Sequence, residues 1–452
     1  MTLPTFKGGD YLKDVSEKYK NIIVSDIIED EISGSIIVNG EAEPLSMSDL
    51  VSLKISRKGS TGQDLQIGAV TAQEITLEKF YEEPDYKKYN NALIGLIYKV
   101  KNPDDNDFET CSLNAFDASS TERKSQTIVI KGYDFMLRFE KKFAEPDSQS
   151  HTLFWWIQKA CTVCDVELGM AESEFNALTN VQTVGAVSIK SGGIFSTWRD
   201  VLHYIAQLIG GYAFIRGASL YFAEFKAENA VLSIPQGLID DGDKVSDSVI
   251  KYTTITAQRG DTLFSATTGE TGRTYELGEL PLLSEFSGDG IYETVLQNIL
   301  ANLSGISYTP FEIKWTGDPA IETGDFVQAG DIVSPIISAD WDFDAMETLK
   351  STASESDTVA TATSSSNSSE SKQIAQVNML LKNYATKKYV DEQTGLKIID
   401  YISKLKFTAS GFITTASDGS NNVFVVNKDS GGKITSIKNT TLNQTLEVEY
   451  GE

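Results

Sequence analysis

Short runs of Val, Ile and Leu, broken by Gly, Pro, Asn or Asp, fill the first third of the chain. Apolar runs of this length between turn residues are typical of β-strands. Five of them lie between about residues 20 and 140: Ile22–Ile27, Gly34–Asn39, Leu50–Arg57, Ala92–Lys99 and Ser125–Lys131. Strands at this spacing favour a small antiparallel barrel or sandwich. We therefore expect an N-terminal β-domain over residues 1–145.

The apolar period changes to that of helices between residues 146 and 247. One helix is indicated by the spacing of Leu153, Trp156, Ile157, Ala160 and Cys161, and Val166–Leu168 could follow as a strand. A second helix, with one apolar face from Trp198 to Ile209, is capped by Ser196 or Thr197, carries Asp200 in its first turn and stops at Gly210-Gly211. Tyr212–Ile215 and Leu220–Phe225 then read as a hairpin. We expect an α+β insertion domain here.

Strand character returns over residues 248–350, interrupted by one amphipathic helix. That helix is predicted for Tyr292–Leu303, which places Val295, Ile299 and Leu300 on one side. Further strands are expected at Phe311–Trp315, Asp325–Gln328 and Asp331–Ile337, with turns between them. This part is thus a second β-domain.

The last hundred residues change character twice. Residues 351–371 are dominated by Ser, Thr, Ala and Asp, which predicts a flexible linker. Residues 372–406 carry two short heptad blocks that suit a helical stalk only if copies of the chain wind together. The stalk positions are Ile374, Val377, Leu381, Tyr384, Ile398, Ile402 and Leu405. Residues 407–452 alternate as strands with Gly-rich turns, predicting a small β tip that again favours an oligomer.

Charge narrows the classes of partner. The chain has 452 residues, and 39 Lys and Arg stand against 64 Asp and Glu, a net charge of -25. Such a surface repels phosphates, so we expect no stable nucleic-acid binding. Met1–Asp10 is polar, so we expect no secretory leader, and the longest apolar stretches fall short of the roughly 18–20 residues that span a bilayer.

No credible active site emerges from the chemistry-bearing residues, and we predict no catalytic residue, cofactor or metal. The two histidines are His151 and His203, and the second lies in a predicted amphipathic helix, where packing is the usual role. Cys161 and Cys164 form a Cys-x-x-Cys, but with Cys111 as the third cysteine they lack a full zinc set and are expected to be buried. The acidic clusters at 104–107 and 240–243 lack the closing Glu of a calcium loop. A pairing such as Asp344 with Glu347 for glycoside hydrolysis is arbitrary from sequence.

Three motifs resemble the baseplate hub or tail-tip proteins of long-tailed bacteriophages, also called prophage tail or tail-associated proteins. They lie at 132–136, at 197–206 with Gly210-Gly211, and at 314–325; the last is the most specific. Their structural residues are Gly132, Tyr133, Asp134, Trp198, Arg199, Asp200, Gly317, Asp318, Pro319, Gly324 and Asp325. Residues 339–351 look like the closing strand of relatives, although Ala345-Met346 replaces two glycines. Separately, Ala385–Asp391 is similar to a segment that leads into trimeric stalks of tail fibres.

The resemblance implies a mostly β, α+β chain in which two hub β-barrels flank the insertion domain. It also implies a homotrimer that joins the sixfold tail tube or distal tail ring to a threefold tip and opens for DNA and the tape-measure protein. The expected location is the tail tip of the virion, after synthesis in the host bacterial cytoplasm. Two alternatives stay open: binding of a host receptor, a saccharide or another tip protein by residues 407–452, and a cell-wall hydrolase.

Overall fold

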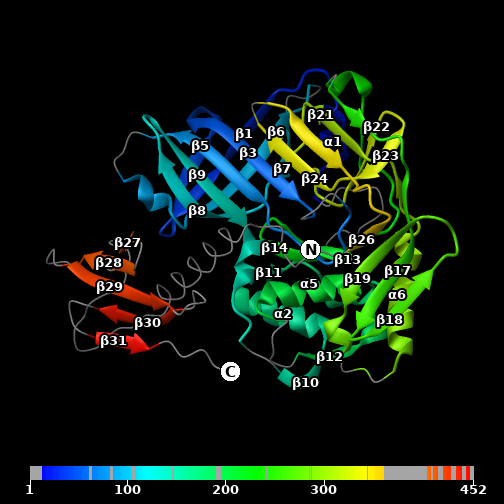
Figure 1. Ribbon diagram of the computed structural model, residues 1–452. Helices are drawn as coiled ribbons and strands as arrows, with labels where there is room; N and C mark the ends of the chain where they lie inside the picture. Colours follow the sequence, from blue (N-terminus) through cyan, green and yellow to red (C-terminus); the bar gives the residue numbers. More distant parts are fainter. Residues whose placement is uncertain are drawn as a thin grey trace. The chain divides into compact units, whose positions relative to one another are not determined.

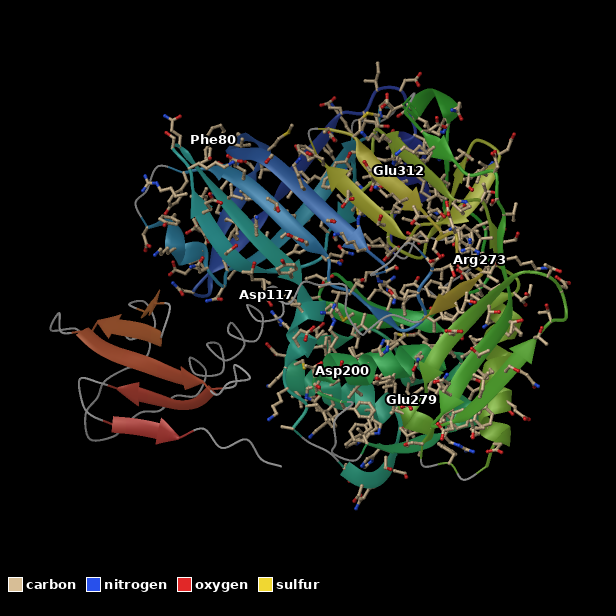
Figure 2. The ribbon with its side chains drawn as sticks, viewed as in Figure 1. Phe80, Asp117, Asp200, Arg273, Glu279 and Glu312 are labelled. Carbon is tan, nitrogen blue, oxygen red and sulfur yellow. The ribbon has the colours of Figure 1, made fainter. Side chains whose placement is uncertain are left out.

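The computed structural model describes residues 13–360, apart from short gaps at 61–63, 82–84, 104–106, 145–146, 190–194, 241, 285, 287 and 344. Beyond residue 360 it describes only five strands between residues 405 and 447. The chain divides into two compact units, Met1–Gln376 and Val377–Glu452. The described part is α+β and mostly β, as the sequence predicts (Figure 1).

A twelve-stranded sheet dominates the first unit, and its strands come from two distant parts of the chain. Its order is β16-β21-β25-β24-β3-β5-β9-β8-β6-β1-β2, with β7 paired to β6. The N-terminal strands are β1 (Asp30–Val38), β2 (Glu41–Ser46), β3 (Leu50–Lys58), β5 (Glu74–Phe80), β6 (Leu93–Lys101), β7 (Phe108–Ser112), β8 (Phe116–Arg123) and β9 (Thr127–Asp134). The later strands are β16 (Lys244–Val245), β21 (Phe311–Trp315), β24 (Ser338–Asp342) and β25 (Glu347–Ser351).

Alternation places one face of this sheet on a core. In β6, Ile94, Leu96, Tyr98 and Val100 are buried at every second position, which is the strand period. The two parts of the sheet meet where β3 pairs antiparallel with β24, with Ile55 opposite Trp341. Both parts contribute side chains to one apolar core, which includes Ile55, Trp315 and Trp341. A small sheet of β15 (Leu232–Ile234), β22 (Phe326–Ala329) and β23 (Ile332–Pro335) contributes to the same core.

The two helices predicted between residues 146 and 247, in the region expected as an insertion domain, are present. Helix α2 (Leu153–Cys164) and helix α5 (Trp198–Leu208) pack together and flank a sheet ordered β11-β14-β13-β4. That sheet contains β11 (Glu167–Leu168), β13 (Gly211–Arg216) and β14 (Ser219–Glu224), and its fourth strand, β4 (Ala69–Val70), comes from the N-terminal region. The remaining elements are α3 (Glu172–Asn176), α4 (Val181–Val184) and the pair β10 (Asp147–Thr152) and β12 (Ala186–Ile189).

A further, five-stranded sheet packs against the predicted amphipathic helix. It is ordered β18-β17-β19-β26, with β20 on β17, and α6 (Gly290–Leu303) contacts β17 and β18. The strands are β17 (Ile250–Arg259), β18 (Thr262–Thr267), β19 (Arg273–Glu279), β20 (Ser307–Tyr308) and β26 (Thr358–Ala360). Its buried apolar side chains belong to the same core cluster as those of the insertion domain. Five 3-10 turns complete the unit: η1 (Met47–Asp49), η2 (Tyr86–Tyr89), η3 (Phe135–Glu140), η4 (Gln236–Leu238) and η5 (Pro281–Leu283).

Residues 248–350 are therefore divided rather than folded as a domain of their own. Strands β21, β24 and β25 extend the N-terminal sheet, whereas β17, β18, β19 and α6 share the core of the insertion domain. The described strands of the large sheet end at β2 and β16, which do not pair with each other. The predicted single β-domain over residues 248–350 is wrong because its strands pair with segments that are distant in sequence. The local pattern of apolar residues carries no information about such pairing.

Two local predictions are wrong in part. No strand forms at Ile22–Ile27: helix α1 (Glu17–Ile23) includes its first two residues, and the first strand begins only at Asp30. Ser16 caps this helix by accepting a hydrogen bond from the Tyr19 amide (3.0 Å), and Tyr19, Ile22 and Ile23 are buried at helical spacing. The linker expected at 351–371 contains β26, which runs parallel to β19 with Val359 buried; residues 361–371 lie outside the described part.

The second unit contains an antiparallel sheet ordered β27-β28-β29-β30-β31. Its strands are β27 (Leu405–Thr408), β28 (Gly411–Thr415), β29 (Asn421–Lys428), β30 (Ile434–Asn439) and β31 (Gln444–Glu447), as the alternation of residues 407–452 predicts. Leu405, counted among the stalk positions, opens β27 and is not helical. The other stalk positions, Ile374 to Ile402, lie outside the described residues, so the stalk stays a prediction.

Candidate functional site

The motif at 314–325 forms the loop between β21 and β22, and two glycines set its course. Gly317 has φ +109° and Gly324 has φ +102°, in the region that side chains with a Cβ rarely adopt. A Cβ on Gly324 would lie 2.0 Å from the hydroxyl of Tyr212 in β13. The loop is thus pressed against the insertion domain, and the predicted turns at both glycines are present.

Asp318 and Pro319 tie this loop to the N-terminal region. Asp318 Oδ1 accepts hydrogen bonds from the Tyr19 hydroxyl (2.7 Å) and the Ala320 amide (2.8 Å). The Pro319 carbonyl accepts from Lys13 Nζ (2.9 Å) and from an Arg57 nitrogen (3.0 Å). Burial, with the charge of Asp318, holds the pKa of Tyr19 far above its usual range, so its hydroxyl stays a donor.

Glu347 collects donors from three elements. Its Oε1 accepts from Arg57 in β3 (2.7 Å), and its Oε2 accepts from Trp315 Nε1 (3.0 Å) and from the Asp318 amide (2.9 Å). Arg57 and Glu347 are both buried in the sheet. Burial raises the pKa of Glu347 to about 7, against the opposing effect of Arg57. This pair lies where β3 meets the later strands.

Glu322, near the C-terminal end of the 314–325 loop, makes a second set of polar contacts. One of its oxygens lies 2.5 Å from Lys13 Nζ, and the other accepts a hydrogen bond from the Gln73 side chain. Asp325 Oδ2 accepts from the Glu322 amide (2.7 Å), which closes the second turn of the motif. All of these side chains are buried.

Gln73 connects this network to the first motif. Its carbonyl accepts from the Asp134 amide (3.0 Å), while its side chain reaches Glu322. Asp134 ends β9 and caps η3 by accepting from the Met136 amide (3.0 Å). Burial raises the pKa of Asp134 to about 7, with a further contribution from Glu322, while backbone groups of Gln73 and Met136 and the charge of Arg199 oppose it.

The second motif reaches the same region through Arg199 in α5. Its guanidinium donates to the Val70 carbonyl (2.6 Å) and pairs with Glu140 in η3 (2.8 Å). Asp200 completes the predicted capping box by accepting from the Thr197 amide (2.8 Å). Trp198 is buried edge-on to Phe143, with ring centroids 4.8 Å apart.

The structure therefore joins acidic or basic residues of all three motifs in one buried polar junction, defined as Lys13, Tyr19, Arg57, Gln73, Asp134, Glu140, Arg199, Asp318, Glu322, Asp325 and Glu347. Gly132 and Tyr133 stay outside it, within β9. A Cβ on Gly132 would lie 2.7 Å from the Asp117 carbonyl, so the glycine permits close strand pairing. Seven of the eleven junction residues were not among the predicted site residues. One signal in the sequence could have identified some of them: a charged residue at a strand position that alternation places on the buried face, as at Arg57 in β3 and Glu347 in β25.

The remaining candidates form no centre of their own. His203 Nδ1 lies 2.6 Å from the Gly68 carbonyl and is buried, while His151 stacks on Trp155 with centroids 3.7 Å apart. All three cysteines are buried, and burial raises the pKa of Cys111 and Cys161 to about 12. Within the described residues no group of His, Cys, Asp or Glu is placed to hold a metal ion. Residues 104–106 and 241 of the two acidic clusters, and Asp344, lie outside the described residues.

Among the described helices, none has the length and apolar character needed to cross a bilayer.

Comparisons with known proteins give structural neighbours only. The sequence matches no known family model and no curated protein. The structure is similar to prophage tail protein gp18 of Listeria monocytogenes EGD-e, at 13% identity and TM-score 0.42, over 78% of this chain and 99% of that one. It is also similar to the 43 kDa tail protein of prophage MuSo2 from Shewanella oneidensis, at 13% identity and TM-score 0.40, over 72% and 97%. A third neighbour is the Francisella PdpA-VgrG complex, at 10% identity and TM-score 0.44, over 72% and 53%.

Proposed function

We propose that this chain is a structural hub protein at the distal end of a bacteriophage tail. The observation that carries the proposal is the single sheet in which N-terminal strands and β21, β24 and β25 are joined at β3 and secured by the polar junction. Four residues of the motifs that resemble tail-tip proteins, Asp134, Arg199, Asp318 and Asp325, belong to that junction, so the role we assign to them is to hold two β regions in a fixed relation. A rigid joint between β regions suits a mechanical part of a particle, whose task is to keep its shape under load.

The same arrangement supports a homotrimer. Strands β2 and β16 end the described sheet, and an open edge is a template for pairing with another chain. Pairing around an axis would cover these edges in a closed ring. Such a ring would contact distal tail or tail tube proteins above, give passage to the tape-measure protein and DNA, and present residues 372–452 as a threefold stalk and tip. The location in the virion would then be the tail tip.

Light scattering of the purified full chain, over a range of concentrations, tests this proposal. We expect a species of three times the 49.5 kDa chain mass. A chain that ends at residue 360 keeps the sheet edges but lacks the predicted stalk. Its oligomeric state therefore shows how much the sheet edges alone contribute to trimer formation. A full chain that stays monomeric at high concentration would contradict the hub.

Binding of a host surface by the C-terminal part is the second candidate. The five strands β27–β31 belong to a compact unit separate from the first, as a tip domain would. The test compares binding of the fluorescently labelled full chain and of the chain that ends at residue 376 to bacterial cell walls. Retention of the full chain alone would support receptor or saccharide binding, whereas clearing of the wall suspension by either protein would favour the hydrolase.

A further inference from the structure

The polar junction contains more buried acids than buried bases. Within the described residues, the buried carboxyl groups are Asp134, Glu140, Asp318, Glu322, Asp325 and Glu347, against Lys13, Arg57 and Arg199 as buried cations. Ionised groups are costly to bury without compensation. A junction with this excess of acids is therefore expected to hold protons that exposed carboxyl groups would lose.

Two of these acids line a small cavity. Its volume is about 20 Å³, and its charged lining residues are Arg57, Lys58, Asp134 and Glu322; Gln73 lines it as well. Gln73 is more than nine-tenths buried, and its Oε1 has no hydrogen-bond partner among the described residues. Gln73 donates from its side chain to Glu322 and accepts from the Asp134 amide with its carbonyl. An unpaired acceptor in a cavity lined by both acids favours a proton on a carboxyl group, because a protonated carboxyl supplies a donor.

We propose that Asp134, Gln73 and Glu322 form a proton-binding site that controls how firmly the large sheet, the 314–325 loop and the insertion domain hold together. The cavity lies where these three parts meet: it is lined by the end of β3, by Glu322-Thr323 and by Tyr212–Ile215 of β13. The inference is independent of the tail-tip function, since it rests only on contacts within one chain.

The other charged and titratable groups around Asp134 fix the direction of the effect. Arg199, from α5, favours the ionised form of Asp134, but it already pairs with Glu140. Glu322 disfavours ionisation, and its own counter-charge is Lys13. Arg57 lines the cavity but pairs with Glu347, and Lys58 is exposed. Tyr212 lines it as well, and burial keeps its pKa high, so it stays neutral.

The sign follows from linkage. Burial raises the pKa of Asp134 to about 7 in the closed junction, whereas an opened junction returns it to its ordinary value of about 4. The closed state thus binds the proton more tightly, and opening becomes easier as pH rises between these two values. Above the higher value both states are ionised and the dependence ends. Acid tightens the junction and neutral to alkaline pH loosens it.

Amide hydrogen exchange of the full chain tests the site, with wild type and Asp134→Asn compared at each pH so that the intrinsic exchange rate cancels. Asparagine keeps an oxygen to cap η3 but cannot ionise. In peptides covering 67–75 and 316–325, we expect the ratio of wild-type to variant exchange rate to rise about 50-fold from pH 5 to pH 7. Peptides from α6 provide an internal reference whose ratio stays constant, and Asp261→Asn, at an exposed turn, provides the matched control.

A ratio that stays flat across this pH range would overturn the proposal. Glu322→Gln adds a second arm: removing its charge lowers the pKa of Asp134, so the rise must move to lower pH, and an unchanged profile would count against the pair. If Asp134→Asn does not fold, infrared spectra of the wild type decide. Because burial also raises the pKa of Glu347 to about 7, the wild-type spectra are compared with those of Glu322→Gln. A protonated-carboxyl band whose disappearance moves to lower pH in that variant supports the site, whereas an unmoved band, or no band at pH 5, refutes it.

Discussion

Arg57 and Glu347 occupy strand positions that normally hold apolar side chains. Each lies in a row of buried alternate positions: Arg57 follows Leu53 and Ile55 in β3, and Glu347 precedes Leu349 in β25. Placed there, each charge depends on the other and on the loop donors for compensation. A buried pair of this kind adds little net stability over an apolar pair, but it makes the correct partner and register specific.

Removing one member of the pair is expected to lower the free energy of unfolding far more than removing a neighbouring exposed charge. Arg57→Met leaves the Glu347 carboxylate buried without its cation, so the free energy of unfolding should fall by about 3–5 kcal/mol. Lys58→Met, on the exposed side of the same strand, should change it by less than about 0.5 kcal/mol. Denaturant unfolding followed by tryptophan fluorescence measures both, because Trp315 and Trp341 lie beside the pair. Equal losses in the two variants would show that the ion pair does not hold the joint.

Gly324 provides a second test at the residue scale. Gly324→Ala combines a positive φ with a Cβ placed 2.0 Å from the Tyr212 hydroxyl, so the loop or β13 must move. We expect a loss of about 2–4 kcal/mol from strain and displaced packing. Gly260→Ala is the matched control, because Gly260 also has a positive φ (+57°) but open space around its Cβ position, and about 1 kcal/mol is expected there. Thermal unfolding of both variants separates conformational strain from the contact with the insertion domain.

At the scale of elements, β26 shows how composition misleads. Its surroundings are rich in Ser and Thr, yet Thr358–Ala360 pairs along β19 and buries Val359. A strand of three residues is stable only because a completed sheet provides the partner. The edge of that sheet is therefore covered by a segment that, judged by its residues, needs no fixed structure.

Truncating the one apolar side chain of β26 should expose this dependence. Val359→Ala is expected to lower the free energy of unfolding by about 1–2 kcal/mol, because it removes buried methyl groups. Val249→Ala is the control, since Val249 is 64% exposed and should cost almost nothing. Thermal midpoints of the two variants give the comparison, and a Val359 variant that matches its control would return the segment to the status of a linker.

For the whole molecule, charge sets an expectation that the fold does not alter. The net charge of -25 repels the phosphate backbone, even though DNA passage is part of the proposed role. We expect no retardation of duplex DNA in a mobility-shift assay at low salt, where electrostatic binding is strongest. Retardation that weakens as salt is added would reveal a local basic surface. The proposal that DNA passes without binding would then be wrong.

The sequence by itself determined the elements whose patterns are local. The helix at Trp198–Leu208 formed because Thr197 and Asp200 cap its first turn and its apolar residues share one face. The strand at Phe311–Trp315 and the five strands of the C-terminal sheet formed where alternation lies between turn residues. The glycine turns at Gly317 and Gly324 were also predictable, since few other residues adopt those φ values.

Only the tertiary structure decided which strands share a sheet and which charges share the junction. Residues 248–350 look uniform along the chain, yet β24 pairs with β3 while β17 packs with α6. Arg57 and Glu347 are 290 residues apart, and Lys13 and Pro319 are 306 apart. A hydrogen bond depends on distance in space, whereas periodicity records only neighbours along the chain, so the motifs could be identified from sequence but their convergence could not.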